Sequence, residues 1–161
     1  MNNNYQSIRI NDAKNIKVVE LGENPVAIEE LVAVARYGAK VVFSKDYCSR
    51  VKKSRNLMEK FLAENRTIYR VTTGFGDNVR NKISQEDMET LQKNIVLSHS
   101  CSVGEPLKKE IVRAIQFMFL LNLGKGFSGI RLEVLELIAA QLNGDVIPFA
   151  PGEGSVVYLA V

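Results

Sequence analysis

Residues 111–123 constrain the fold more than any other part of the chain, because they are hydrophobic on nearly every side when wound as a helix. Their polar members are Arg113, Gln116 and Asn122. A helix of this kind must be covered on most sides by other elements. With these interruptions, the segment falls short of the roughly 20 apolar residues that a membrane span requires. It therefore predicts a helical protein with a substantial core and no membrane span.

The composition is typical of a soluble globular protein. Of 161 residues, 46% are hydrophobic and 24% are charged, a proportion that can build one domain with a sizeable core. The 21 basic and 18 acidic residues are spread along the chain, which indicates a solvated surface and no nucleic acid partner. Residues 1–15 form a polar segment without the apolar core of a secretory signal, so we expect a cytoplasmic protein.

The two cysteines, Cys48 and Cys101, lie far apart in the sequence and form no Cys-x-x-Cys pair. This spacing indicates neither a zinc site nor a redox motif, and we expect no metal. Cysteine is among the most frequently buried residue types. We therefore predict two buried free thiols.

The first third of the chain begins with a short extended piece at residues 17–21 and then becomes helical. Asn24 and Pro25 predict a helix cap followed by the first helical position, and Gly38 predicts the end of that helix. Apolar spacing predicts a second helix over residues 46–63. The glycine-rich residues 72–77 predict an exposed loop.

The rest of the chain predicts three more helices. Ser84 and Asp87 have the spacing of a capping box at the start of a helix that carries His99 on its apolar face. Pro106 predicts the start of the next helix, which contains residues 111–123. The last helix is expected to end at residues 143–144 and carries these apolar residues: Leu132, Leu135, Ile138 and Leu142. These elements predict a mainly α protein with a single helical domain over residues 1–161.

Residues 124–129 match the dinucleotide pattern G-x-G-x-x-G. That pattern binds phosphate when it follows a strand in a βαβ unit. Here it follows the most helical segment of the chain, so it predicts a connection between helices. We expect no nucleotide site.

Four groups of motifs occur in order along the chain. The second reads Tyr-Arg-Val-Thr-Thr-Gly-Phe-Gly, and the third contains Asn-Ile-Val-Leu-Ser-His-Ser. The fourth ends in Gly-Ser-Val. In sequence order the groups are residues 33–38 with 51–55; residues 69–76; residues 91–100 with 103–107; and residues 122–131 with 143–148 and 154–156.

Together these motifs resemble the histidine and aromatic amino acid ammonia-lyases over residues 18–157. The resemblance implies a mainly α fold, namely the N-terminal helical domain of the ammonia-lyase (fumarase/aspartase-like) fold with a short N-terminal extended segment. It implies the family reaction, the elimination of ammonia from L-histidine or a related aromatic amino acid. Family members are large homotetramers, so it also implies an oligomer.

Tyr69 matches the family's lid tyrosine, which implies the base that removes the β-proton of the substrate. Gly74, Phe75 and Gly76 match the lid loop, whose glycines would let it close over a ligand. A structural alternative is open, in which the Tyr69 ring packs against a neighbour and the glycines make a turn. Departures from the family pattern are Arg70 and Thr72, and Leu121 in the fourth motif.

Ser98 and His99 match the pair found in histidine-type members, where the imidazole helps hold the substrate ring. The resemblance therefore implies a substrate-binding role for both residues and favours histidine over phenylalanine. His99 is the only histidine in the chain. A lone histidine on a buried apolar face, with one ring nitrogen bonded to backbone, is the structural alternative.

Tyr158, Leu159 and Ala160 stand where the family has Ala-Ser-Gly. In the family that tripeptide cyclises to a methylidene-imidazolone, which requires a serine hydroxyl that leaves and a glycine nitrogen free of a Cβ. Leu159 has no leaving group, so we do not expect this cofactor to form. Ser155 is a nearby hydroxyl, but Val156 follows it, and a branched residue disfavours the tight ring closure.

Two hypotheses follow. In the first, the chain is the N-terminal portion of a histidine ammonia-lyase-like protein, inactive alone because the sequence stops at Val161 before most of the family's substrate-binding groups. In the second, it is a truncated, non-catalytic remnant that acts as a ligand-binding or self-association domain. Both predict a homo-oligomer or association with a complementary lyase chain, since apolar helix faces rarely stay exposed. An amino acid is a possible ligand.

Overall fold

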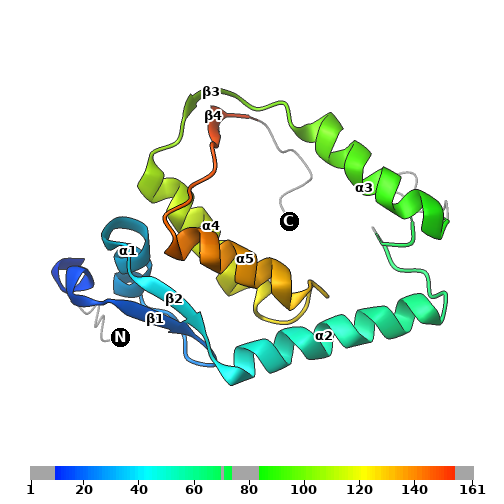
Figure 1. Cartoon of the computed structure of the whole chain (residues 1–161), viewed down its shortest axis with the longest axis horizontal. Helices are drawn as coiled ribbons and strands as arrows, with labels where there is room; N and C mark the ends of the chain where they lie inside the picture. Colours follow the sequence, from blue (N-terminus) through cyan, green and yellow to red (C-terminus); the bar gives the residue numbers. More distant parts are fainter. Residues whose placement is uncertain (1–9, 70, 74–83, 155–161) are drawn as a thin grey trace, which may run out of the picture. The chain divides into compact units, whose positions relative to one another are not determined.

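The computed structural model describes residues 10–69, 71–73 and 84–154. Within these residues the protein is mostly helical, as predicted, with short strands between the helices (Figure 1). The elements, in chain order, are the 3-10 helix η1 (Ile10–Asn15), β1 (Val18–Leu21), α1 (Ile28–Tyr37), β2 (Lys40–Phe43), α2 (Lys45–Ala63), α3 (Gln85–His99), β3 (Val103–Pro106), α4 (Lys109–Leu123), α5 (Leu132–Asn143) and β4 (Pro151–Glu153).

The chain divides into two compact units. Unit 1 comprises Met1–Asn56 and Pro106–Ala150, and unit 2 comprises Leu57–Glu105 and Pro151–Val161. Two compact units can belong to one folding domain, so the single helical domain over residues 1–161 stays a prediction. In unit 2, β3 and β4 pair as a two-stranded sheet.

After η1, unit 1 contains a β–α–β arrangement. Strands β1 and β2 are parallel, with Val18 opposite Lys40 and Leu21 opposite Phe43. Parallel strands need a crossover, and α1 supplies it. The extended piece at residues 17–21 is thereby confirmed as β1, whereas β2 was not predicted. At four residues, β2 is too short to give a clear alternating pattern.

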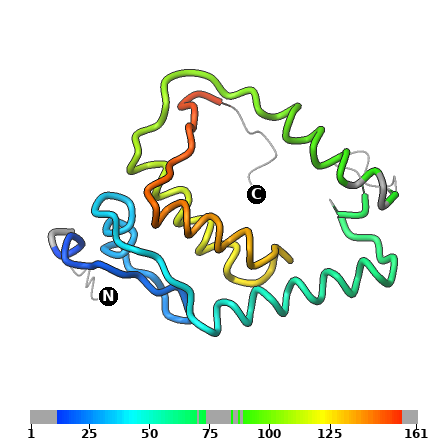
Figure 2. Tube along the Cα trace, in the orientation of Figure 1, coloured from blue at the N-terminus to red at the C-terminus, as the bar shows by residue number. Residues whose placement is uncertain are grey.

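The core of unit 1 lies where α1, α4 and α5 meet the small sheet. Figure 2 shows α4 and α5 side by side, and α1 and α4 also pack against each other. Phe117 and Leu120 of α4 are fully buried, as is Leu135 of α5. Burying side chains of this size contributes about 1.5–3 kcal/mol each. The predicted apolar face of the last helix is confirmed, with Leu132, Leu135 and Leu142 buried.

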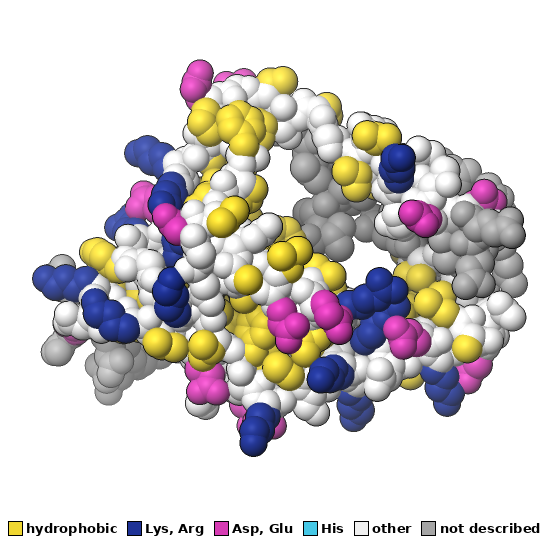
Figure 3. All heavy atoms as spheres, viewed as in Figure 1, with side chains coloured by type: hydrophobic (Ala, Val, Ile, Leu, Met, Phe, Trp, Pro, Cys, Tyr) yellow, Lys and Arg dark blue, Asp and Glu magenta, His cyan; other side chains and the backbone are white. Residues whose placement is uncertain are grey.

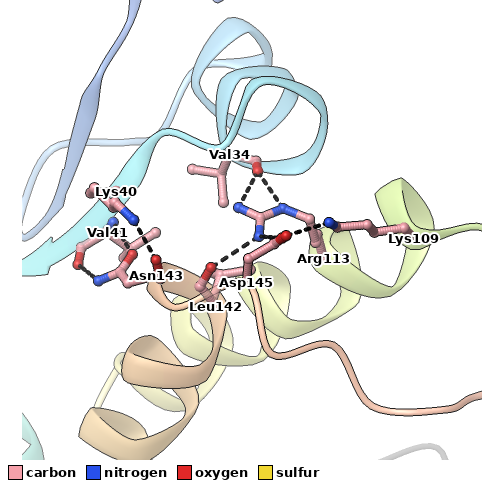
Figure 4. Close-up of polar contacts among 8 residues, drawn as sticks. All are labelled: Val34, Lys40, Val41, Lys109, Arg113, Leu142, Asn143 and Asp145. Atoms are coloured by element: carbon pink, nitrogen blue, oxygen red, sulfur yellow. Dashed lines mark hydrogen bonds and ion pairs between the residues drawn. The ribbon is translucent and has the colours of Figure 1, made fainter.

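A buried arginine joins three of these elements (Figure 4). Arg113 of α4 donates from Nε and Nη2 to the carbonyl oxygen of Val34, in the last turn of α1, at 2.9 and 2.8 Å. Its Nη1 donates to the carbonyl oxygen of Leu142, near the end of α5, and to Asp145 Oδ1, at 2.9 and 3.0 Å. Lys109 pairs with the same carboxylate. The polar interruption of the apolar segment is therefore a cross-link between helix ends.

Asn143 makes a second cross-link, between α5 and β2. Its Oδ1 accepts from the Val41 N–H, and its Nδ2 donates to the Val41 carbonyl oxygen, both at 2.8 Å. The side-chain amide thus satisfies the backbone of β2 as a neighbouring strand would. The predicted end of the last helix at residues 143–144 is confirmed.

Helix ends test the predicted caps. Gly38 ends α1 in the left-handed conformation at φ 70°, as predicted. The predicted start at Asn24 and Pro25 is wrong, because α1 begins at Ile28 and the Glu30 carboxylate accepts the N–H of Ala27, the N-cap residue. The carboxylate of Glu30 thereby satisfies a backbone N–H group at the start of the helix that has no partner within the helix.

The sequence also predicted where two helices in the second half of the chain begin. Ser84 caps α3, since its Oγ accepts the N–H of Asp87 at 3.1 Å, which confirms that boundary. Pro106 does not start a helix, because it is the last residue of β3, and α4 starts at Lys109. Proline at a strand end needs no N–H partner, so the same residue suits either position.

The cysteines differ from the prediction. Cys48 is partly buried and Cys101 is exposed, and neither forms a disulfide. Cys101 follows the exposed end of α3, where no core covers it. In the described ranges, no helix is both long and apolar enough to cross a membrane.

Candidate functional site

Tyr69 lies in unit 2, in the turn that follows α2. Its side chain is 49% exposed. The turn is closed by the carbonyl oxygen of Ile68, which accepts the N–H of Val71 at 3.1 Å and of Thr72 at 2.9 Å. Tyr69 therefore stands on a defined turn with half of its surface accessible, as a group that reaches a ligand must be.

The side chain of Thr72 organises this turn. Its hydroxyl accepts the N–H of Ile68 at 2.8 Å and donates to the carbonyl oxygen of Arg66 at 3.1 Å. Thr72 is one of the departures from the family pattern, and here it ties the segment after α2 back onto itself. The buried Thr73 follows it. Gly74, Phe75 and Gly76, the predicted lid loop, lie outside the described residues, as does Arg70.

His99 is the last residue of α3, also in unit 2, and it is exposed. Its Nδ1 lies 2.9 Å from the carbonyl oxygen of Ile95 and 2.9 Å from Ser98 Oγ. A carbonyl can only accept, so Nδ1 carries the proton, and in the neutral ring Nε2 presents a lone pair. The alternative of a buried structural histidine is confirmed in one respect and wrong in the other. One ring nitrogen of His99 does bond to backbone, but the side chain is exposed and not buried.

Ser98 is exposed beside His99, and its hydroxyl donates to the carbonyl oxygen of Ile95 at 3.2 Å. The two predicted substrate-binding side chains therefore share one backbone acceptor at the end of α3. Tyr69, Ser98 and His99 all belong to unit 2. Tyr158, Leu159 and Ala160, at the electrophile positions, and Ser155 lie outside the described residues.

Unit 1 contains a cavity of about 910 Å³ that sequence reasoning missed. Its lining includes a stripe of α4 and the loop between β1 and α1. Apolar side chains dominate its lining. They include Val26, Ile111, Ile115, Met118, Phe119 and Phe127. The signal for this cavity was the helix that is apolar on nearly every side, because this chain covers only part of it.

The floor of this cavity contains Tyr47 and Arg50 of α2. The Tyr47 hydroxyl donates to the Leu120 carbonyl oxygen at 2.8 Å, and burial raises the pKa of this phenol. Arg50 donates to the carbonyl oxygens of Gly124 and Gly22 at 3.0 and 3.2 Å. Its guanidinium lies 5.9 Å from the centre of the Tyr47 ring. Backbone acceptors thus hold both side chains, and Arg50 places a cation in a mostly apolar hollow.

Residues 124–129 form the connection between α4 and α5, as predicted. Gly124 lies against the Tyr47 ring, where an added Cβ would be 2.0 Å from a ring carbon. The glycine is therefore required for close approach of a side chain. In the ranges that the structure describes, no group of three or more His, Cys, Asp or Glu side chains could hold a metal ion.

Comparison with known proteins gives these positions a context. The model of the family "Aromatic amino acid lyase" matches residues 26–159. The chain belongs to this family. The match includes every predicted site residue from Tyr69 to Leu159 and the whole of α4 and α5.

Among curated relatives, the chain is 43% identical over 141 residues to histidine ammonia-lyase of Caldanaerobacter subterraneus subsp. tengcongensis. It is also 43% identical over 141 residues to the histidine ammonia-lyase of Symbiobacterium thermophilum. In both cases the alignment covers 88% of this chain and 28% of the relative. The chain therefore spans little more than a quarter of the length of the relatives it matches.

Solved structures confirm the ammonia-lyase fold. Tyrosine aminomutase from Streptomyces globisporus superimposes with a TM-score of 0.79 at 33% identity, covering 85% of this chain and 26% of that one. Histidine ammonia-lyase from Trypanosoma cruzi superimposes with a TM-score of 0.76 at 32% identity, covering 86% and 27%. The resemblance seen in the sequence motifs is thereby confirmed as membership of the family.

Proposed function

We propose that this chain is the N-terminal portion of a histidine ammonia-lyase-like protein, whose reaction eliminates ammonia from L-histidine or a related aromatic amino acid. The observation that carries this proposal is the 43% identity to histidine ammonia-lyases over 88% of the chain. Ser98 and His99 add to it, because the resemblance assigns this pair to histidine-type members.

In this proposal, Tyr69 is the base that takes the β-proton, and His99 holds the substrate ring. The half-exposed position of Tyr69 supports the first role. The contact of His99 Nδ1 with the Ile95 carbonyl oxygen supports the second, because it leaves Nε2 to accept a hydrogen bond from a ligand N–H. Ser98 orients the ring, because its hydroxyl oxygen accepts a hydrogen bond from Nδ1–H.

We propose further that the chain by itself does not form the electrophile. Tyr158, Leu159 and Ala160 do not fit the self-formed methylidene-imidazolone, because Leu159 is a hydrocarbon side chain that cannot leave as water. Activity therefore requires this group from a complementary lyase portion. An amino acid ligand would bind only where that portion completes the site.

The test has two readouts on the purified chain. Intact mass is expected to equal that of the unmodified sequence, whereas cyclisation would remove two water molecules. Incubation with L-histidine is expected to release neither ammonia nor an unsaturated acid. Release of both by the chain alone would overturn its proposed inactivity. With the complementary lyase portion added, release from L-histidine in preference to L-phenylalanine checks the proposed substrate.

A second candidate is a non-catalytic domain that binds a ligand or associates with itself. The 910 Å³ apolar cavity favours it, together with exposed side chains such as Phe127, which is 91% exposed. Exposed hydrophobic side chains also gather over α5 on the face shown in Figure 3. Light scattering over a concentration series tests self-association. Ammonia release after addition of the complementary lyase portion distinguishes the candidates, because a non-catalytic domain stays inactive there.

A further inference from the structure

Helix α4 carries two apolar stripes, and unit 1 covers only one of them. Phe117 and Leu120 are fully buried against α1 and α5. On the other stripe, Ile111, Ile115 and Met118 remain 42%, 41% and 49% exposed. These three residues recur at intervals of four and three, so they lie on one face of the helix. A contiguous apolar face of this kind marks a site of interaction with another element or protein.

The exposed stripe is one wall of the cavity of about 910 Å³. Val26 lines the cavity from the loop before α1, and Phe127 lines it from the connection after α4. Phe127 is 91% exposed, and Phe119 is 45% exposed. An enclosed pocket for a small molecule would bury such rings. A hollow bordered by exposed aromatic side chains instead fits an apolar helix or segment of another protein portion.

The charge of the cavity lining, and the part of the relatives that lies outside the alignment, indicate which protein segment covers this face. The charged residues that line the cavity are Glu23, Arg50 and Lys125, so the hollow carries an excess of positive charge. The relatives continue for most of their length beyond what this chain matches, since the alignment covers 28% of each. A segment from that remaining length, apolar with a flanking carboxylate, complements the hollow in shape and charge.

We propose that the face formed by the α4 stripe and this cavity is the docking surface for the remaining portion of a lyase polypeptide. The docked segment places bulky apolar side chains against Ile115 and Met118 and an acidic side chain opposite Arg50 and Lys125. This inference rests on the proposed function, because it takes the complementary lyase portion as the partner. It adds the location of the contact on this chain.

The experiment uses the full chain, co-expressed with the part of Caldanaerobacter histidine ammonia-lyase that follows the matched region. The test variants are Ile115→Asp and Ile111→Asp. An aspartate at position 111 stands in the first turn of α4, where the helix dipole tolerates it, so that variant keeps its fold. The matched control is Leu137→Asp, which adds the same charge at a 59% exposed leucine of α5 outside the cavity lining.

We expect a complex with the wild-type chain and with Leu137→Asp. We expect either cavity variant to raise the Kd of this complex by about 30-fold or more, as for the loss of one interface hot spot. Amide hydrogen exchange of α4 should slow in the complex. A complex that tolerates both cavity variants as well as Leu137→Asp overturns the docking surface and leaves the proposed function intact.

A covalent chimera covers the case in which the isolated lyase remainder fails to fold. In it, residues 1–157 of this chain replace the corresponding region of the Caldanaerobacter enzyme, which keeps its own electrophile segment. An inactive, unassembled chimera counts against the proposed function and against the docking surface with it. An active chimera whose thermal stability falls no more with Ile115→Asp than with Leu137→Asp counts against the docking surface alone.

Discussion

The guanidinium of Arg113 donates two hydrogen bonds to the carbonyl oxygen of Val34, at 2.9 and 2.8 Å. Val34 stands in the last turn of α1, where carbonyl groups lack an intrahelical partner. The same guanidinium binds the carbonyl oxygen of Leu142 near the end of α5. One buried cation thus satisfies the negative ends of two helices, which favours a positive charge at this point.

Replacement of Arg113 by methionine is expected to destabilise the protein strongly. The change leaves the buried Val34 carbonyl group without its donor and removes one hydrogen bond from the Leu142 carbonyl group, which costs about 3 kcal/mol in the free energy of unfolding. Urea denaturation followed by circular dichroism measures this change. The control is Arg36→Met, which breaks the exposed ion pair with Glu110 and should cost less than about 1 kcal/mol. Equal losses in the two variants would contradict the proposed helix-end role.

Stability is expected to fall in acid through Asp145. The hydrogen bond from Lys109, followed by the charges of Lys109 and Arg113, holds the pKa of this carboxyl below its usual value. A lowered folded-state pKa contributes stability above the unfolded value of about 3.9, and this contribution disappears as the pH falls through the folded value. The gap in urea midpoint between wild type and Asp145→Asn should therefore close as the pH drops below about 4.

Stability is expected to fall in alkali through Tyr47. Burial raises the pKa of its phenol, so the folded state keeps the proton after the unfolded chain has lost it. The resulting stabilisation is complete below the unfolded value of about 10 and is lost as the pH rises above it. Tyr47→Phe should remove this alkaline slope. At neutral pH it should cost about 1 kcal/mol, from the hydrogen bond to Leu120.

Tyr37 supplies the control for this prediction, because its side chain is 50% exposed and lies outside the buried core. Tyr37→Phe should leave the alkaline slope of the wild type unchanged. An alkaline slope that persists in Tyr47→Phe would assign the effect to another group.

Gly124→Ala is expected to unfold the cavity floor. The added Cβ would stand 2.0 Å from a carbon of the Tyr47 ring, and that ring is buried. Overpacking of this kind costs about 1–3 kcal/mol or more. At Gly38 the space is open, so alanine there pays only for the φ of 70°, about 1 kcal/mol. Thermal unfolding of both variants should rank Gly124→Ala as the more damaging.

In an active chimera with a lyase remainder, Tyr69→Phe is expected to lower kcat by about 100-fold or more with an unchanged melting temperature. His99→Asn should mainly raise KM for L-histidine, because it removes the proposed contact with the substrate ring. A normal kcat in Tyr69→Phe would remove this residue from the proposed mechanism. A fall in melting temperature would indicate that its role is structural.

The helices of this protein were predictable from periodicity and local signals. The span of α2, the capping of α3 by Ser84 and the end of α1 at Gly38 follow from residues close together in the chain. Pro25 and Pro106 misled the prediction, because the preference of proline for the first helical turn is shared by strand ends and loops. The four-residue β2 exists because β1 pairs with it, which no local pattern reveals.

The candidate site was predictable in part. Tyr69, Ser98 and His99 came from motif resemblance, and the structure places them all in unit 2. The exposure of His99 was not predictable, because its burial depends on whether another element covers the end of α3. The cavity in unit 1 was also missed, since its walls come from residues that lie far apart in the chain.

The sequence by itself determined the family and most of the helices, and it carries the proposal that the electrophile does not form, because each depends on the identity or spacing of nearby residues. Leu159 cannot dehydrate in any conformation. Only the tertiary structure decided that Arg113 joins two helix ends and that one stripe of α4 stays uncovered. Both outcomes depend on which distant elements pack against α4, and packing is a property of the assembled chain.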